Sequence, residues 1–168
     1  KKIAVIDSRS AGSELVLLVK KICELIESGA DFETVVEKAE LYSRHTHVVF
    51  ALSSFNNLVK NGRMSKIVGF VANKLGFWGI GIGSEQGTIE IKQKIRGSKK
   101  ALDAIIEDMK ERGYNCGKVV ISHCRNAEFA ESVKSAIQSV WDKAEVKIVH
   151  ARGLCSYYAE KGGLIIGF

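Results

Sequence analysis

The sequence contains no proline, so its turns depend on its 16 glycines. It also lacks any apolar run close to the roughly 20 residues that a membrane-spanning helix needs, and we predict no membrane span. The first residues, KKIAVIDSRSAG, lack the apolar core and the small-residue cleavage site of a signal peptide. Together these absences predict a cytoplasmic protein.

The four cysteines form no C-x-x-C motif. Reduced thiols are the usual state of such cysteines in a chain without a secretory signal. His123 and Cys124 are adjacent, so in a strand their side chains would point to opposite faces and could not share a metal ion. We therefore predict neither a metal site nor another cofactor. The cysteines are Cys23, Cys116, Cys124 and Cys155.

The formal net charge of +6 favours anionic partners, or reflects a basic surface alone. A nucleic-acid partner is not predicted, because no aromatic residues are interleaved with the lysines and the chain has no finger spacing or basic arm. One short segment concentrates the positive charge, either as a solvated face or as a docking surface for an acidic partner. It consists of Lys92, Lys94, Arg96, Lys99 and Lys100.

Apolar segments of strand and helix type alternate along the chain. This alternation, with one hairpin, predicts an α/β fold of three layers, α/β/α, around a mixed β-sheet. Strands are expected at 3–6, 46–52, 77–83, 88–95, 118–123, 144–150 and 163–168. Helices are expected at 10–28, 31–42, 54–60, 65–75, 98–109, 126–141 and 154–159, with Ser10, Asp31, Ser98 and Asn126 as N-caps.

A domain boundary is predicted near residues 44–46. One strand and two helices precede it, which cannot close a sheet by themselves, whereas the segment after it has enough strands for a domain. We therefore interpret residues 1–45 as the C-terminal part of a first α/β domain and residues 46–168 as a second α/β domain.

The segment FWGIGIG predicts a strand with one bare face. Alternation places Gly79, Gly81 and Gly83 on one side of that strand, where the absence of side chains permits a close approach to the backbone. The approaching group is either the preceding helix or an alkyl chain lying in a slot. The glycines lie within the strand and not in a strand-to-helix turn, so they are not a dinucleotide-binding motif.

Two arginines precede predicted helix starts. Arg63 lies two residues before Ser65, and Arg96 lies two residues before Ser98. Guanidinium groups beside free helix amides bind carboxylate or phosphate, so both could converge on one anion. Two further hypotheses remain open: an enzyme acting on a phosphorylated or carboxylated small molecule through Arg63, Arg96 and His150, and a module that docks an acidic partner without any ligand.

Four segments in order, VIDSRSAG, LSSFNNLVKNGRMSK, IRGSKKA and GGLIIGF, resemble the DegV family of bacterial fatty-acid-binding proteins. This resemblance implies a two-domain α/β protein whose apolar tunnel holds one long-chain fatty acid. The protein presents the carboxylate to a fatty acid kinase and is not itself an enzyme. Most of the family's first domain, which supplies further carboxylate-binding residues, is missing from this sequence.

The resemblance also implies a set of site residues. Tyr158 falls where the family carries a histidine near the carboxylate, and Gly79 and Lys161 fall where it favours proline. A phenol can donate a hydrogen bond but brings no positive charge. The residues implied to face the carboxylate or the kinase are Arg63, Ser65, Arg96 and Tyr158, and those implied to bind the lipid are Ser10, Ala11, Ile67, Phe70, Val71, Leu75, Gly79 and Gly81.

Overall fold

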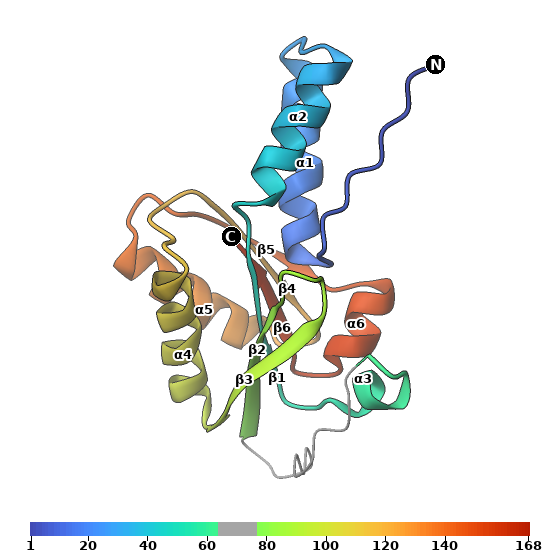
Figure 1. Ribbon diagram of the computed structural model, residues 1–168. Coiled ribbons are helices and arrows are strands. Elements are labelled where there is room, and N and C mark those ends of the chain that lie inside the picture. The colour runs from blue at the N-terminus through green and yellow to red at the C-terminus, as the bar shows by residue number, and fades with distance from the viewer. Residues whose placement is uncertain (64–76) are drawn as a thin grey trace.

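Figure 1 shows a computed structural model of the chain, which describes residues 1–63 and 77–168. Within these residues six strands form a sheet in the order β3-β2-β1-β6-β4-β5. The strands are β1 (Val48–Leu52), β2 (Phe77–Gly83), β3 (Ile89–Arg96), β4 (Lys118–His123), β5 (Glu145–His150) and β6 (Leu164–Gly167). The helices are α1 (Ser13–Glu27), α2 (Phe32–Ser43), α3 (Asn56–Lys60), α4 (Ser98–Glu111), α5 (Ala127–Val140) and α6 (Gly153–Ala159). The helix predicted at 65–75 lies outside the described residues, together with Ser65, Ile67, Phe70, Val71 and Leu75.

The sheet is mixed, as predicted. Strand β1 pairs antiparallel with both β2 and β6, and β6 pairs antiparallel with β4. Strands β4 and β5 are parallel and are joined through α5. This arrangement confirms the α/β class, and no helix among the described residues has the length and apolar character needed to cross a membrane.

Helices cover both faces of the sheet, which confirms the three layers (Figure 1). Helices α4 and α5 pack on one face over a first apolar cluster, in which Ile80, Ile105 and Ile137 are fully buried. Helices α3 and α6 and the start of α1 lie on the other face. Successive side chains of a strand point to opposite faces of the sheet. Val49 of β1 thus belongs to the first cluster, and its neighbour Phe50 faces the opposite side.

The start of α1 is fixed to the sheet by a buried serine. The Ser13 hydroxyl lies 2.7 Å from Ser122 Oγ and 2.7 Å from the carbonyl oxygen of Ile165. A Cβ atom at Gly167 would lie 2.4 Å from the backbone nitrogen of Glu14, so only glycine allows the helix to approach β6 so closely. Beyond this contact, α1 and α2 extend together away from the sheet (Figure 1).

The strand predicted at residues 3–6 is not formed. Ile3 and Val5 are 86% and 89% exposed, and the segment runs as an extended chain beside α1 and α2 (Figure 1). A strand needs a neighbour for its backbone groups, and no described strand pairs with this segment. The apolar run predicted a buried strand, but a local pattern cannot show whether a neighbouring strand is present to pair with it.

Strand β3 is less regular than its alternating sequence predicts. The pairing with β2 shifts at a bulge between Ile80 and Gly81, and this reverses which side chains face each layer. Ile95 therefore packs on the first cluster, whereas Ile89 and Ile91 face the opposite side. Strict alternation along residues 89–95 would instead place all three isoleucines on one face.

Helix starts follow the sequence prediction only in part. Asp31 caps α2 by accepting a hydrogen bond from the backbone N–H of Thr34, as predicted. Helices α1 and α4 instead begin after Gly12 and Gly97, at φ of 71° and 92°, so Ser10 and Ser98 are not their N-caps.

Candidate functional site

The face of the sheet beneath α3 and α6 carries a second apolar cluster. Its buried members come from β1, α3 and α6 and from the turn between β1 and α3. Partly buried side chains from β3, α6 and β6, and Cys124 directly after β4, surround them. An apolar surface between a sheet and two short helices is suited to contact with hydrocarbon. The buried members are Phe50, Leu52, Phe55, Leu58 and Ala159, and the surrounding ones include Ile89, Ile91, Tyr158 and Ile165.

The bare face of β2 turns toward this second apolar cluster. A Cβ atom at Gly79 would lie 2.3 Å from the Phe55 ring, and one at Gly81 would lie 2.4 Å from the Phe50 ring. The close approach expected at these glycines is thus made by aromatic side chains of the same chain. The slot expected directly over the glycines is occupied by these rings, and a direct role of Gly79 and Gly81 in lipid binding stays a prediction.

Helices α3 and α6 are held together by the carboxylate of Glu160. Oε2 accepts a hydrogen bond from the Ser54 hydroxyl at 2.7 Å, and Oε1 accepts one from the backbone N–H of Asn57 at 2.9 Å. Glu160 adopts a positive φ of 53°, which is uncommon for a residue with a side chain. The Asn57 side chain adds a 2.8 Å hydrogen bond to the carbonyl oxygen of Tyr157.

Replacing Glu160 with alanine is expected to lower the free energy of unfolding by roughly 1 to 3 kcal/mol, because two hydrogen bonds to a charged acceptor are lost. Chemical denaturation measures this loss, with exposed Glu131→Ala on α5 as the control. Hydrogen exchange at the Asn57 amide should become faster in the Glu160→Ala variant. Unchanged exchange at that amide would show that Glu160 does not hold α3.

Arg63 directly precedes residues 64–76, and Arg96 pairs with Phe77, the residue that directly follows them. Arg63 is exposed and directly follows the turn after α3, where its backbone N–H donates to Leu58 at 2.9 Å. Arg96 is also exposed and ends β3 opposite Phe77, with its guanidinium carbon 5.8 Å from the ring centroid. Neither guanidinium forms an ion pair within residues 1–63 and 77–168. Their convergence on one anion stays a prediction.

Tyr158 and the Ser10–Ala11 turn both lie beside the second apolar cluster. The half-buried Tyr158 packs against it, and the hydroxyl forms no hydrogen bond with any described residue, so its proton can be donated to a ligand. Ala11 is exposed, and the Ser10 hydroxyl donates to the Glu14 carboxylate. The next residue is Gly12, and a Cβ atom added there would lie 3.3 Å from the side chain of Ile165, which belongs to the cluster.

The enzyme hypothesis required Arg63, Arg96 and His150 at one site, and the fold does not allow it. Arg96 ends β3 and His150 ends β5, and these strands form the two opposite edges of the sheet. With about 4.8 Å between neighbouring strands, the two edges are about 24 Å apart. One small substrate cannot bridge that distance, so this constellation was wrong.

His150 instead pairs with His123 at the ends of the two parallel strands, with 4.5 Å between ring centroids. Burial, and secondarily the electrostatic influence of His150, lowers the pKa of His123, and burial also lowers the pKa of His47. A lowered pKa means that the unfolded chain binds more protons in acid than the folded chain. The stability contribution is complete above the ordinary histidine pKa of about 6.5 and is lost as the pH falls through the folded-state value.

The free energy of unfolding is therefore expected to decrease as the pH falls below about 6.5. The His123→Asn variant keeps an acceptor for the Asn126 N–H and should reduce this slope without abolishing it, because His47 still titrates. Three further side chains line the same pocket as His123, and their charges also influence the measured slope: His150, Arg125 and Lys161. Urea titrations between pH 5 and 8 measure the slope, and His45→Asn, which removes an exposed histidine near His47, should change it less than His123→Asn does. An unaltered slope in His123→Asn would contradict this expectation.

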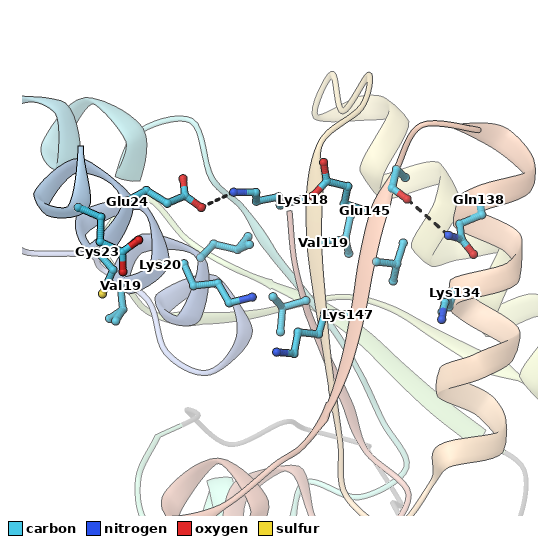
Figure 2. A pocket seen from close by; sticks show the side chains of 15 residues that line it. Val19, Lys20, Cys23, Glu24, Lys118, Val119, Lys134, Gln138, Glu145 and Lys147 are labelled. Atoms are coloured by element: carbon cyan, nitrogen blue, oxygen red, sulfur yellow. Dashed lines mark hydrogen bonds and ion pairs between the residues drawn. The ribbon is translucent and has the colours of Figure 1, made fainter.

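A separate groove of about 680 Å³ lies between α1 and the sheet edge formed by β4 and β5. Figure 2 shows Glu24 of α1 pointing to Lys118 of β4, and their hydrogen bond lowers the pKa of Glu24 and raises that of Lys118. Both groups are exposed, so the pair adds little to stability. Further charged residues line the groove, including Lys20, Lys134, Glu145 and Lys147. Apolar side chains line it as well, among them Leu17, Val119 and Val146, so charged and apolar surface are mixed along the groove.

Sequence reasoning missed three residues of this region, Phe50, Phe55 and Glu160. Phe50 could have been assigned to the glycine face, because it alternates with buried Val49 and Ala51 along β1. Phe55 follows the strand in an irregular turn, and Glu160 reaches a segment about 100 residues away in the chain. No local pattern signals either contact.

A family model described as "Uncharacterised protein, DegV family" matches residues 1–168. A DegV domain-containing protein of Streptococcus pneumoniae R6, spr0652, is 43% identical over 167 residues, which make up 99% of this chain and 59% of that protein. The S. pneumoniae Fatty Acid Kinase (Fak) B3 protein, solved loaded with linoleic acid, superposes with a TM-score of 0.95 at 43% identity, covering 99% of this chain and 59% of that one.

A DegV family protein from Eubacterium eligens, solved loaded with heptadecanoic acid, also superposes with a TM-score of 0.95. It is 37% identical, and the match covers 99% of this chain and 60% of that protein. The chain therefore spans about three fifths of the length of these relatives.

Proposed function

The chain belongs to the DegV family, and from this membership we propose that it binds a long-chain fatty acid and presents the carboxylate to a fatty acid kinase. Membership confirms the resemblance based on the four sequence motifs. The observation that carries the proposal is the similarity of the whole chain, at 43% identity, to a fatty acid kinase B protein loaded with linoleic acid.

The second apolar cluster is the surface on which we place the hydrocarbon tail. Each methylene group removed from water contributes roughly 0.8 kcal/mol, so a long tail supplies most of the affinity. Ile89 and Ile91 of β3, Tyr158 of α6 and Ile165 of β6 are only partly buried there, which leaves apolar surface for a ligand. The Phe50 and Phe55 rings then form the floor between the tail and the glycine face.

The carboxylate needs hydrogen bonds that offset the loss of its hydration. No described residue accepts the phenol proton of Tyr158, which lies beside the cluster. Arg63 follows α3, which Glu160 and Asn57 fix to α6. We propose that Tyr158 and Arg63 face the carboxylate and that Arg96 faces the kinase. Ser65 lies outside the described residues, and we propose that it faces the carboxylate or the kinase together with Arg63.

The proposed role is non-catalytic and needs no cofactor, because the chemistry of phosphorylation belongs to the kinase. The carrier and the kinase must then share a compartment, which we infer to be the bacterial cytoplasm.

We propose that a further domain completes the lipid cavity. Residues 1–45 belong to that first domain, and residues 46–168 form the second domain. Exposed apolar side chains outside the sheet support this division. They lie on the N-terminal segment and along α1, and are Ile3, Val5, Leu15, Val19 and Ile26.

Native mass spectrometry of the intact protein purified from bacteria tests the proposal. We expect a bound mass corresponding to one fatty acid, and re-uptake of oleate or palmitate after delipidation. A protein that carries no lipid and takes up neither acid would refute fatty-acid binding.

A further inference from the structure

A pocket of about 580 Å³ lies where the parallel strands β4 and β5 end. His123 and His150 are the last residues of these strands, and they are register partners. Ligands of open α/β sheets commonly bind beyond the carboxyl ends of parallel strands. No carboxylate lines this pocket among the described residues, whereas His123, Arg125, His150 and Lys161 all do.

The His123 ring is held as a neutral hydrogen-bond donor. It is 4% exposed, and its Nδ1 accepts the backbone N–H of Asn126 at 3.1 Å. An accepting Nδ1 places the proton of the neutral ring on Nε2. That Nε2–H forms no hydrogen bond with another described residue and is available to a ligand.

The other polar groups of the pocket are also available. Arg125 and Lys161 are exposed, and neither forms an ion pair with a described residue. The Tyr157 hydroxyl accepts a hydrogen bond from the Asn61 side chain at 3.1 Å, which leaves its own proton free to be donated. The pocket thus brings cationic and neutral donors together without an internal anion.

Backbone hydrogen bonds fix the loops that carry these groups. The amide of Cys124 donates to Gly163 at 2.9 Å, and the amide of Gly162 donates to Cys124 at 2.8 Å. The amide of Ala151 donates to His123 at 2.9 Å, which ties the end of β5 to β4. Because these loops are already ordered, binding requires little further loss of conformational entropy.

We propose that this pocket binds the phosphate group of a small molecule or of a lipid headgroup. A phosphate dianion offers enough acceptor oxygens for the guanidinium of Arg125, the ammonium of Lys161 and the donor of His123 at once, whereas a carboxylate has only two oxygens. The site borders the proposed fatty-acid surface, because Cys124 lines the pocket and also packs against the second apolar cluster. Helix α6 contributes a different residue to each, Tyr157 to the pocket and Tyr158 to the cluster.

Histidine NMR resonances of the intact protein test the inference. Inorganic phosphate is titrated at pH 7 and constant ionic strength, and the second arm uses phosphatidylcholine vesicles with and without phosphatidic acid. Saturable shifts of His123 and His150 with inorganic phosphate support a free phosphate ligand. Shifts that require phosphatidic acid support a headgroup. No shift in either arm overturns the proposal, whether or not the protein carries a fatty acid.

Variants that each remove one positive charge distinguish a specific phosphate site from the general electrostatic attraction of phosphate to a basic protein. Lys161→Ala and Arg125→Ala should each weaken phosphate binding about fivefold or more, as expected for loss of one charge-assisted contact. Lys143→Ala removes one exposed charge outside the pocket and should leave the affinity unchanged. Equal weakening in all three variants would overturn the site.

Discussion

Gly81→Ala is expected to lower the free energy of unfolding by about 3 kcal/mol, at the upper end of overpacking effects in cores. The added methyl group would lie 2.3 Å from the backbone carbonyl oxygen of Glu90 and 2.4 Å from the Phe50 ring. Phe50 is 7% exposed and cannot turn away without opening the second apolar cluster. The Glu90 carbonyl belongs to β3, so relief there would require the strands to separate.

Chemical denaturation of Gly81→Ala measures the loss, and Gln93→Ala on the exposed side of β3 is the control. Gly79→Ala should cost less, because the three atoms nearest to its methyl group all belong to the Phe55 ring, and a side chain yields more easily than backbone. If Gly81→Ala were as stable as the parent protein, the rings would not pack on the glycine face as described.

Arg63→Ala is expected to reduce acyl phosphate formation by the kinase about tenfold or more, while the affinity for the fatty acid falls less than about threefold. This division follows from position. Arg63 is exposed after α3, whereas the apolar tail dominates affinity and contacts the second apolar cluster. Arg96→Ala should act in the same direction, because Arg96 is exposed and pairs with Phe77, which directly follows residues 64–76.

Lys60→Ala is the matched control for Arg63, since it removes one exposed positive charge three residues earlier. Lipid content by mass spectrometry and the initial rate with the kinase are measured on the same preparation. A folded Arg63→Ala protein that emerges empty of lipid would contradict this division between rim charge and apolar tail.

Much of the fold follows from periodicity. Long amphipathic segments such as α4 and α5 specify their type locally, and the buried runs of β1 and β4 do the same. Residues 3–6 carry the same apolar signal as β4 but have no described strand to pair with, which a local pattern cannot reveal.

The candidate site was less predictable because its contacts join distant segments. The glycines of β2 correctly indicated a close approach, but the sequence could not show that Phe50 and Phe55 make it. The bulge opposite Ile80 moved Ile95 to the other layer, a change that alternation alone cannot detect. The pattern of an arginine preceding a predicted helix start supplied Arg63 and the family resemblance supplied Tyr158, whereas the geometry supplied Glu160 as the link between α3 and α6.

A crystal structure of the intact protein, purified from bacteria without delipidation, tests the central claim most directly. We expect elongated electron density along the second apolar cluster, in contact with Ile91, Tyr158 and Ile165, and with its polar end within hydrogen-bond distance of the Tyr158 hydroxyl. The account would be contradicted if that cluster were closed by protein side chains and the fatty acid lay elsewhere or were missing.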